Sequence, residues 1–324
     1  MKKAAFVAAL LPLAFAATAA RADGETVALF TKNQTNPYFQ AVRVGSEMAA
    51  KSMNAKVVNY IPTKPDSIPE QLSQVEDVIV KKPAGIVFIP VDYKAMVPGV
   101  EEINKAQIPV VNITDRLAGG KSLTFIGADD YSLGKETARY LLKELGGKGN
   151  VVILEGVKGS ISSIDRVRGF NDAIKEFKDV KLVASQPANF QRLQALQVME
   201  NVMQSNPQID GVLAANDAMA IGAIEALDGA NRKAKVTGVN ATKEAIDAIK
   251  AGKMLASGDY DGFIQGCLGT MALLRSLRNE PIVTEIILQP KVVNATNYQP
   301  YDVALENRTC PTWEQGVALG AKKN

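Results

Sequence analysis

The stretch GVLAANDAMAIGAIEALDGANRKAKVTGVN, residues 211–240, contains one complete unit of the predicted fold. The run GVLAA at its start carries no polar side chain, residues 218–227 are rich in alanine, the strongest helix former, and residues 235–240 form a second candidate strand. A strand that is apolar on both faces is typical of a parallel sheet covered by helices on both sides. The order strand, helix, strand therefore predicts a right-handed βαβ unit.

The same alternation of short apolar runs and longer helical patterns extends along the chain. Further candidate strands lie at residues 27–30, 56–60, 85–90, 109–113, 123–126, 150–154, 181–184 and 255–257. About ten strands are too many for one comfortable sheet, and 324 residues are more than one hydrophobic core normally holds. We therefore predict an α/β protein with two similar lobes, each built on a doubly wound parallel sheet.

The chain is expected to cross between the lobes more than once. The expected crossings are Gly127-Ala128, just after Ile126, then Gly258-Asp259-Tyr260, and finally Gln289-Pro290. The first lobe would then contain residues 23–128 and 261–289, and the second residues 129–260 and 290–324. Several crossings make a hinge. Because ligands bind beyond the carboxyl ends of the strands in open α/β sheets, we expect a binding site in the cleft between the lobes.

The N-terminus has the pattern of a secretory signal peptide. Lys2 and Lys3 precede an apolar run at residues 4–20, and Ala20-Arg21-Ala22 fits a small-x-small cleavage site. We predict a signal peptide at residues 1–22 and a mature chain that begins at Asp23. An uncleaved membrane anchor is the alternative, and the short apolar run with a cleavage site directly after it argues against that alternative.

The composition excludes several classes of function. The chain has no histidine, which removes Ser-His-Asp and Cys-His catalysis and most zinc sites. Its 37 basic and 34 acidic residues are interspersed, without the basic stripe that nucleic acid requires. The Gly/Ser-rich loop at residues 156–163 lacks the lysine and hydroxyl of a phosphate-binding loop. We expect a protein that is not an enzyme, carries no cofactor or metal and binds no nucleic acid.

The two cysteines, Cys267 and Cys310, leave two alternatives open. Export would place them in an oxidising compartment, where they could form a disulfide. They could equally remain unpaired and partly buried thiols. Their spacing matches no metal-binding motif.

Polar and aromatic residues recur at the ends of the candidate strands. Tyr38 falls off the apolar face of its helix, and its flat ring suits the C–H face of a sugar. Asn36 stands before Pro37, so helix capping alone is the alternative for it. Asp115 and Arg116 offer acceptors and a fork of donors for vicinal hydroxyls, or else form a surface ion pair. Other candidates of this kind are Arg166, Phe190, Asn216 and Asn240.

These motifs together resemble the ribose-binding-protein family, from about residue 26 to residue 292. The motifs that carry the resemblance are Asn36-Pro37-Tyr38-Phe39, Asp115-Arg116, Arg166 with Gly169-Phe170, Gln186-Pro187-Ala188-Asn189-Phe190 and Asn216-Asp217-Ala218-Met219-Ala220. The family consists of periplasmic sugar-binding components of ABC transporters with a type I binding-protein fold. The resemblance implies a periplasmic protein that closes its lobes on a small sugar or polyol and docks on the membrane permease subunits. Some members also bind a chemoreceptor, and no residue here indicates that second partner.

The resemblance also implies a role for each matched residue. The rings that would enclose the sugar are Tyr38, Phe39 and Phe190. The residues that would bind its hydroxyls are Asn36, Asp115, Arg116, Arg166 and Asn216. Lys32 stands where ribose binders have a small hydroxyl residue, and an allose-binding relative has lysine there. Replacing Arg166 by alanine is expected to abolish binding with little effect on the ligand-free protein.

Two departures from the family argue against plain ribose. Asn240 stands where ribose binders have aspartate, and Tyr260 where they have glutamine. The pocket thereby loses negative charge and gains bulk, so an anionic sugar acid and a short polyol both remain candidate ligands. A small polar solute that is not a sugar is a further alternative. A sugar-responsive DNA-binding regulator would need an N-terminal helix-turn-helix in place of the signal peptide. The tail beyond Val292 is longer than in ribose binders, and packing is the only role we assign to its aromatic residues and Cys310.

Overall fold

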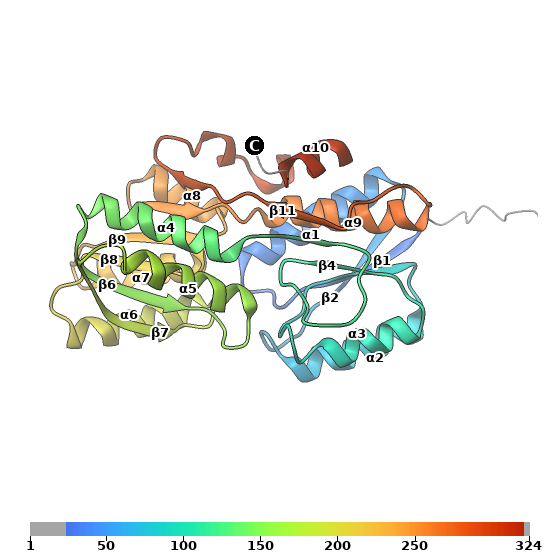
Figure 1. Cartoon of the computed structure of the whole chain (residues 1–324), viewed down its shortest axis with the longest axis horizontal. Helices are drawn as coiled ribbons and strands as arrows, with labels where there is room; N and C mark the ends of the chain where they lie inside the picture. The colour runs from blue at the N-terminus through green and yellow to red at the C-terminus, as the bar shows by residue number, and fades with distance from the viewer. Residues whose placement is uncertain (1–23, 321–324) are drawn as a thin grey trace, which may run out of the picture.

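The computed structural model describes residues 24–320, and the predicted signal peptide at residues 1–22 lies outside the described residues. Two six-stranded sheets form two lobes that lie side by side (Figure 1). The predicted α/β architecture with two parallel-sheet lobes is therefore confirmed. Within residues 24–320, no helix has both the length and the apolar composition needed to cross a bilayer.

The first lobe is built on a parallel sheet in the order β11-β5-β4-β3-β1-β2. Its strands are β1 (Thr26–Phe30), β2 (Lys56–Tyr60), β3 (Gly85–Phe88), β4 (Val110–Ile113), β5 (Phe125–Ala128) and β11 (Glu285–Leu288). Its helices are α1 (Pro37–Ser52), α2 (Ile68–Lys81), α3 (Val97–Lys105) and α9 (Gly262–Leu277). Along β1, Val27 and Leu29 join the apolar cluster under α1 and α9, while Ala28 and Phe30 join the cluster under α2 and α3. This alternation explains why the strand is apolar throughout.

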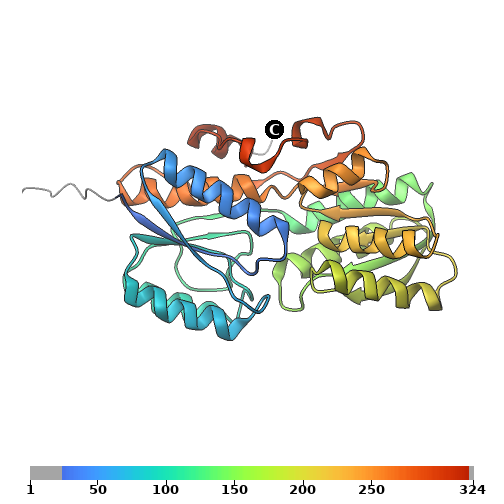
Figure 2. The same ribbon diagram turned by 180° about the vertical axis from the view of Figure 1, so that it is seen from behind.

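The second lobe repeats the plan in the order β12-β10-β9-β8-β6-β7. Its strands are β6 (Lys148–Glu155), β7 (Asp179–Pro187), β8 (Gly211–Ala214), β9 (Lys235–Val239), β10 (Ala256–Gly258) and β12 (Val292–Asn294). Its helices are α4 (Asp130–Glu144), α5 (Ile161–Ile174), α6 (Arg192–Ser205), α7 (Asp217–Gly229) and α8 (Lys243–Lys250). Helices α4 and α5 cover one face, seen in Figure 1, and α6 and α7 cover the other, seen in Figure 2.

The chain passes between the two sheets after β5, after β10 and between β11 and β12. Strands β11 and β12, of four and three residues, are not among the strands predicted from the sequence. Strand β12 pairs with β10 in the antiparallel direction, so the chain reverses directly after its last passage. The parallel strands of each lobe place their carboxyl ends at the edge that faces the other lobe, which is where the site is expected.

The C-terminal tail does not stay in the second lobe, and the assignment of residues 290–324 to that lobe is wrong for its later part. The short helix η1 (Gln299–Tyr301) contributes Tyr301 to the second lobe's apolar cluster. The chain then continues through η2 (Leu305–Asn307) to α10 (Trp313–Leu319), which packs on α9 and β11 of the first lobe. The physical reason is apolar burial, since Trp313 joins the first lobe's cluster. Both views show the tail running along one edge of both lobes (Figures 1 and 2).

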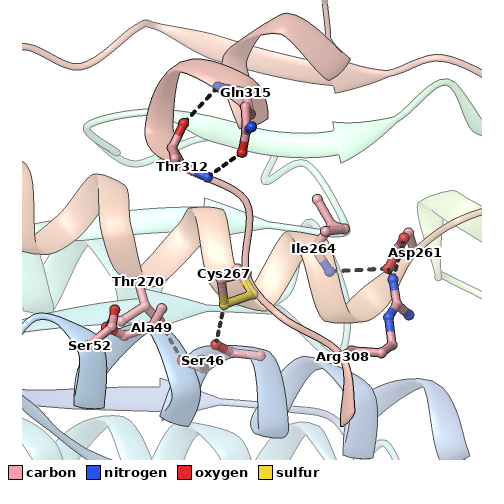
Figure 3. The surroundings of a disulfide bond; sticks show 12 residues. Ser46, Ala49, Ser52, Asp261, Ile264, Cys267, Thr270, Arg308, Thr312 and Gln315 are labelled. Atoms are coloured by element: carbon pink, nitrogen blue, oxygen red, sulfur yellow. Dashed lines mark hydrogen bonds and ion pairs between the residues drawn. A yellow bond between two sulfur atoms is a disulfide. The ribbon is translucent and has the colours of Figure 1, made fainter. Parts of the chain in front are cut away.

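A disulfide fixes the tail to the first lobe (Figure 3). Cys267, buried in α9, is bonded to Cys310, and their Cα atoms lie 5.7 Å apart. Of the two alternatives left open by the sequence, the structure thus contains the disulfide. Nearby, Arg308 donates hydrogen bonds of 2.9 and 2.8 Å to the two carboxylate oxygens of Asp261, at the start of α9. The tail is therefore held both covalently and by a charged pair next to the hinge.

Candidate functional site

A small cavity lies between the lobes at the carboxyl ends of the strands. Its walls are formed by Lys32, Asn36, Tyr38, Phe39, Thr114, Asp115, Ser162, Arg166, Phe190, Asn216, Asn240 and Tyr260. The structure thus brings together all the residues that the sequence analysis nominated as ligand contacts, with the exception of Arg116. Both lobes contribute, so a molecule in this cavity would contact the two lobes at once.

Helix caps position two of the polar residues. The side-chain oxygen of Asn36 accepts a hydrogen bond from the Tyr38 N–H at 3.0 Å, and that of Asn216 accepts one from the Met219 N–H at 2.9 Å. Each cap holds its side chain at the start of a helix that directly follows a strand. Capping and cavity lining are therefore combined in Asn36, and its amide N–H₂ remains available to a ligand.

Several residues around the cavity adopt left-handed backbone conformations. Positive φ angles occur at Thr114 (69°), Asn189 (53°), Phe190 (58°) and Asn240 (133°), and at Asp261 (35°) by the hinge. Such conformations are costly for residues with a Cβ atom and concentrate at functional sites. They indicate that the loops are shaped to place particular side chains in the cavity.

Aromatic rings from both lobes line the cavity. Tyr38 lies between Phe39, at 5.3 Å between ring centroids, and Tyr260, at 5.4 Å. Phe190 comes from the other lobe, where its ring lies so close to Gly156 that a Cβ atom there would be 2.1 Å from it. Glycine at position 156 is therefore needed for this ring position. A small ring or chain in the cavity would therefore meet aromatic side chains from both lobes.

The Tyr38 hydroxyl belongs to a buried hydrogen-bond chain. Thr114 donates its hydroxyl proton to the side-chain oxygen of Gln265 at 3.0 Å, so Tyr38 donates to the Thr114 oxygen at 2.9 Å. Burial raises the pKa of Tyr38 well above its usual range, which keeps the phenol neutral. This chain fixes the ring at the floor of the cavity.

Lys32 and Asp115 form a buried ion pair in the cavity wall. The Lys32 ammonium also donates a hydrogen bond of 3.4 Å to the Ser160 hydroxyl in the second lobe. The Asp115 carboxylate accepts a hydrogen bond of 3.2 Å from the Ser162 backbone N–H, also in the second lobe. Both charged residues therefore contact the opposite lobe.

Arg166 is held on three sides. Its Nε donates to Asp130 at 2.7 Å, its Nη1 donates to the Ala215 carbonyl at 2.8 Å, and its guanidinium lies 4.3 Å from the centre of the Tyr260 ring. Asp130 also lies 2.9 Å from the Tyr260 hydroxyl, and its burial raises the pKa of this carboxyl to about 6 against the opposing effect of the Arg166 charge. With Nε–H and one Nη1–H used in this way, the second Nη1–H and the Nη2 donors remain for a ligand.

The lobes are in contact around the cavity. Besides the Lys32 and Asp115 contacts, the Thr35 hydroxyl of the first lobe donates to the Gln191 side-chain oxygen of the second at 3.0 Å. The structure is therefore a closed arrangement, and a ligand of this cavity would enter and leave only when the lobes separate.

Arg116 lies outside the cavity, apart from the other residues predicted to bind ligand hydroxyls. Its side chain is 51% exposed, donates to Glu285 at 2.8 Å and lies 3.9 Å from the centre of the Phe125 ring. The carboxylate and the ring satisfy the guanidinium on the outer surface. The surface ion pair, which was the alternative for this residue, is what the structure shows.

Several residues of the site were not singled out from the sequence. Thr114 and Ser162 line the cavity, and Asp130 lies directly behind Arg166. Asp130 carried a usable signal, because it follows a candidate strand as the other site residues do. Ser162 belongs to a Gly/Ser-rich loop whose sequence indicated only that it does not bind phosphate.

Two parallel-sheet lobes that close on a buried polar and aromatic cavity define a two-lobed solute-binding protein. Residues 27–281 match the model of the periplasmic binding protein domain family, and the chain belongs to that family. The chain is 29% identical to the ribose import binding protein of Haemophilus influenzae over 91% of this chain and 100% of that protein. It is 27% identical to the xylitol-binding protein of Mycolicibacterium smegmatis over 90% of this chain and 82% of that one.

A solved structure extends the comparison. A periplasmic solute-binding protein of an ABC transporter from Actinobacillus succinogenes, solved with bound D-allose, superposes with a TM-score of 0.81 at 34% identity. The match covers 86% of this chain and 100% of that chain. The resemblance inferred from the motifs is thereby confirmed at the level of sequence and of fold.

Proposed function

We propose that this chain is a periplasmic solute-binding protein that encloses one neutral sugar or polyol between its lobes and delivers it to an ABC importer. The observation that carries the proposal is the interlobe cavity, in which aromatic faces and hydrogen-bonding groups from both lobes converge. Relatives named for ribose and xylitol, and a related structure with bound D-allose, support this class of ligand.

The charges around the cavity favour a neutral ligand over a sugar acid. Lys32 is paired with Asp115, and Arg166 is paired with Asp130, so each cation has a carboxylate partner. A ligand carboxylate would add a negative charge without an uncompensated cation to receive it. Hydroxyls, in contrast, both donate and accept, and suit a site that presents carboxylate, amide and guanidinium groups.

Closure of the lobes supplies the mechanism. The ligand contacts both halves of the cavity only in the closed form, so it shifts the hinge equilibrium by its higher affinity for that form. Specificity follows from burial, because an analogue that lacks one hydroxyl leaves a polar partner unsatisfied in the closed cavity. We expect binding and release without chemical conversion of the ligand.

Delivery requires export and a membrane partner. The predicted signal peptide directs the chain to the periplasm, and family membership supports that location. We expect the closed, ligand-bound form to be the one that the permease subunits of the importer recognise, since closure alters the relative position of the two lobes.

A thermal-shift screen tests the proposal. The panel contains D-ribose, D-allose, xylitol, ribitol, myo-inositol and D-xylonate, with calorimetry on each compound that shifts the melting temperature. We expect at least one neutral compound to bind with one molecule per chain and to stabilise the fold by about 2.7 kcal/mol at one hundred times its Kd. Arg116→Ala serves as a control and should retain this binding. A protein that prefers D-xylonate to every neutral compound would contradict the proposal.

A further inference from the structure

Asp130 is a charged residue that lies next to the cavity without lining it. It lies behind two residues that do line it, Arg166 and Tyr260. One carboxylate oxygen accepts the Arg166 Nε–H at 2.7 Å, and the other lies 2.9 Å from the Tyr260 hydroxyl. The side chain of Arg166 is only 3% exposed, and that of Asp130 only 9%. Asp130 is therefore positioned to control Arg166 without lining the cavity.

Without Asp130, Arg166 would favour a ligand that carries a carboxylate. A guanidinium buried in a small cavity and facing a ligand forms short, charge-assisted hydrogen bonds with a carboxylate. Asp130 already occupies the Nε side of the guanidinium and supplies the compensating charge. Because Lys32 is also paired, with Asp115, a carboxylate on the ligand would have to be buried next to two existing carboxylates.

We propose that Asp130 is a positioning residue that determines which ligand charge the cavity accepts. It holds Arg166 as a donor to neutral hydroxyls, and its own negative charge excludes sugar acids from the cavity. The inference rests on the proposed function and deepens it, since it names the residue responsible for the neutral ligand class. It predicts that neutralising this one side chain changes which ligands bind, and not merely how tightly the protein binds.

Other charged and titratable groups surround this pair. Asp115 faces it from the first lobe, Tyr38 from α1 and Tyr260 from the hinge, and Asp217 at the start of α7 also interacts with Arg166. Burial raises the pKa of both Asp130 and Asp217 to about 6. Protonation of either carboxyl makes the surroundings of Arg166 more positive. Acidification therefore acts in the same direction as removal of the Asp130 charge.

The test compares Asp130→Asn with Asp129→Asn. An asparagine at position 130 retains an oxygen for the Arg166 Nε–H and offers an N–H₂ to the Tyr260 oxygen. Asp129, the adjacent residue, is exposed and caps α4 by accepting the Ser132 N–H at 3.0 Å, a role that asparagine also performs. Both variants remove one negative charge, at adjacent positions. Only Asp130→Asn changes a side chain that contacts the cavity residues Arg166 and Tyr260.

Calorimetry at pH 7.5 should use matched pairs of neutral compound and acid: xylitol with D-xylonate, ribitol with D-ribonate, and D-allose with D-allonate. For Asp130→Asn we expect the ratio of acid affinity to neutral affinity to rise by about tenfold or more, the range of a hydrogen bond to a charged group. Asp129→Asn should keep the wild-type ratio within about twofold.

The same ratio measured on the wild type at pH 7.5 and pH 5.5 provides a second test that needs no substitution. We expect the ratio of acid affinity to neutral affinity to rise as the pH falls. An equal loss of affinity for both members of each pair in Asp130→Asn, or a wild-type ratio that does not change with pH, would overturn the inference. Either result leaves the proposed function standing if the wild type binds a neutral compound, whereas a wild-type preference for D-xylonate would reject the proposed function itself.

Discussion

The carboxylate of Asp115, in the first lobe, accepts a hydrogen bond of 3.2 Å from the backbone N–H of Ser162, in the second. The same carboxylate is paired with Lys32, whose ammonium donates to the Ser160 hydroxyl across the cleft. The groups that line the cavity are thus also the groups that join the lobes. Ligand binding and lobe closure are therefore linked through the same charged atoms.

Asp115→Asn should weaken ligand binding by about 10-fold to 100-fold, because an amide is a weaker acceptor and Lys32 loses its buried partner. Calorimetry with the neutral compound that binds the wild type measures this loss. Asp77→Asn is the matched control, since Asp77 is 48% exposed and forms an ion pair with Lys81 on the surface of α2. An affinity within about twofold of the wild type for Asp115→Asn would remove this residue from the site.

Arg166→Ala should abolish binding and also destabilise the ligand-free protein. The second effect differs from the expectation based on sequence, because the structure shows that Arg166 compensates the buried charge of Asp130. Removing one partner of a buried pair costs about 3–5 kcal/mol. Chemical denaturation of the ligand-free protein should show this loss, and the double variant Arg166→Ala/Asp130→Asn should recover part of it. A single variant as stable as the wild type would contradict the buried pairing.

The sequence was sufficient to predict the fold and most of the cavity wall. Asn216 and Asn240 closely follow strands β8 and β9, and Tyr38 lies in the first turn of α1, the helix after β1. The parallel arrangement brings such positions together at the carboxyl ends of the strands. Arg116 could not be placed in this way, because neighbouring side chains leave the backbone in different directions and Thr114 adopts a positive φ just before it. The path of the tail depends on long-range contacts, among them a disulfide between residues 43 positions apart, which no local pattern encodes.

Asp259, at the hinge, should make the protein more stable at mildly acidic pH. One of its oxygens accepts the Tyr301 hydroxyl at 2.7 Å, and the other is buried with no hydrogen-bond partner among residues 24–320. Burial, reinforced by the charge of Asp261, raises the pKa of Asp259 to about 6, above its ordinary value of 3.8. The folded state therefore binds more protons than the unfolded state between these values, and stability falls as the pH rises through 6.

The expected result is a wild-type melting temperature that is higher at pH 5.5 than at pH 7.5. Three other carboxyls, those of the buried Asp130 and Asp217 and the half-buried Asp66, have pKa values raised to about 6 and contribute with the same sign. Asp259→Asn should be more stable than the wild type at pH 7.5 and should show a smaller change with pH. Asp228→Asn, at a side chain that is 58% exposed, should keep the wild-type change. An identical pH dependence in Asp259→Asn would exclude the hinge carboxyl as a cause.

Removing the disulfide should detach the tail before the lobes unfold. In the chain-entropy model, a crosslink between residues 43 apart contributes about 4 kcal/mol. The single tryptophan of the chain, Trp313, lies in α10, where the Arg275 guanidinium is 5.3 Å from the centre of its ring, so its fluorescence reports on the packing of the tail against the first lobe. In Cys267→Ser/Cys310→Ser, the fluorescence transition should precede the loss of helical circular dichroism on heating, whereas the two should coincide in the oxidised wild type.

Thr312→Ala, which removes the capping box of α10 and costs about 1 kcal/mol, is the control for local destabilisation and should separate the transitions far less. Coincident transitions in the cysteine variant would mean that apolar packing and the Arg308–Asp261 pair hold the tail without the disulfide.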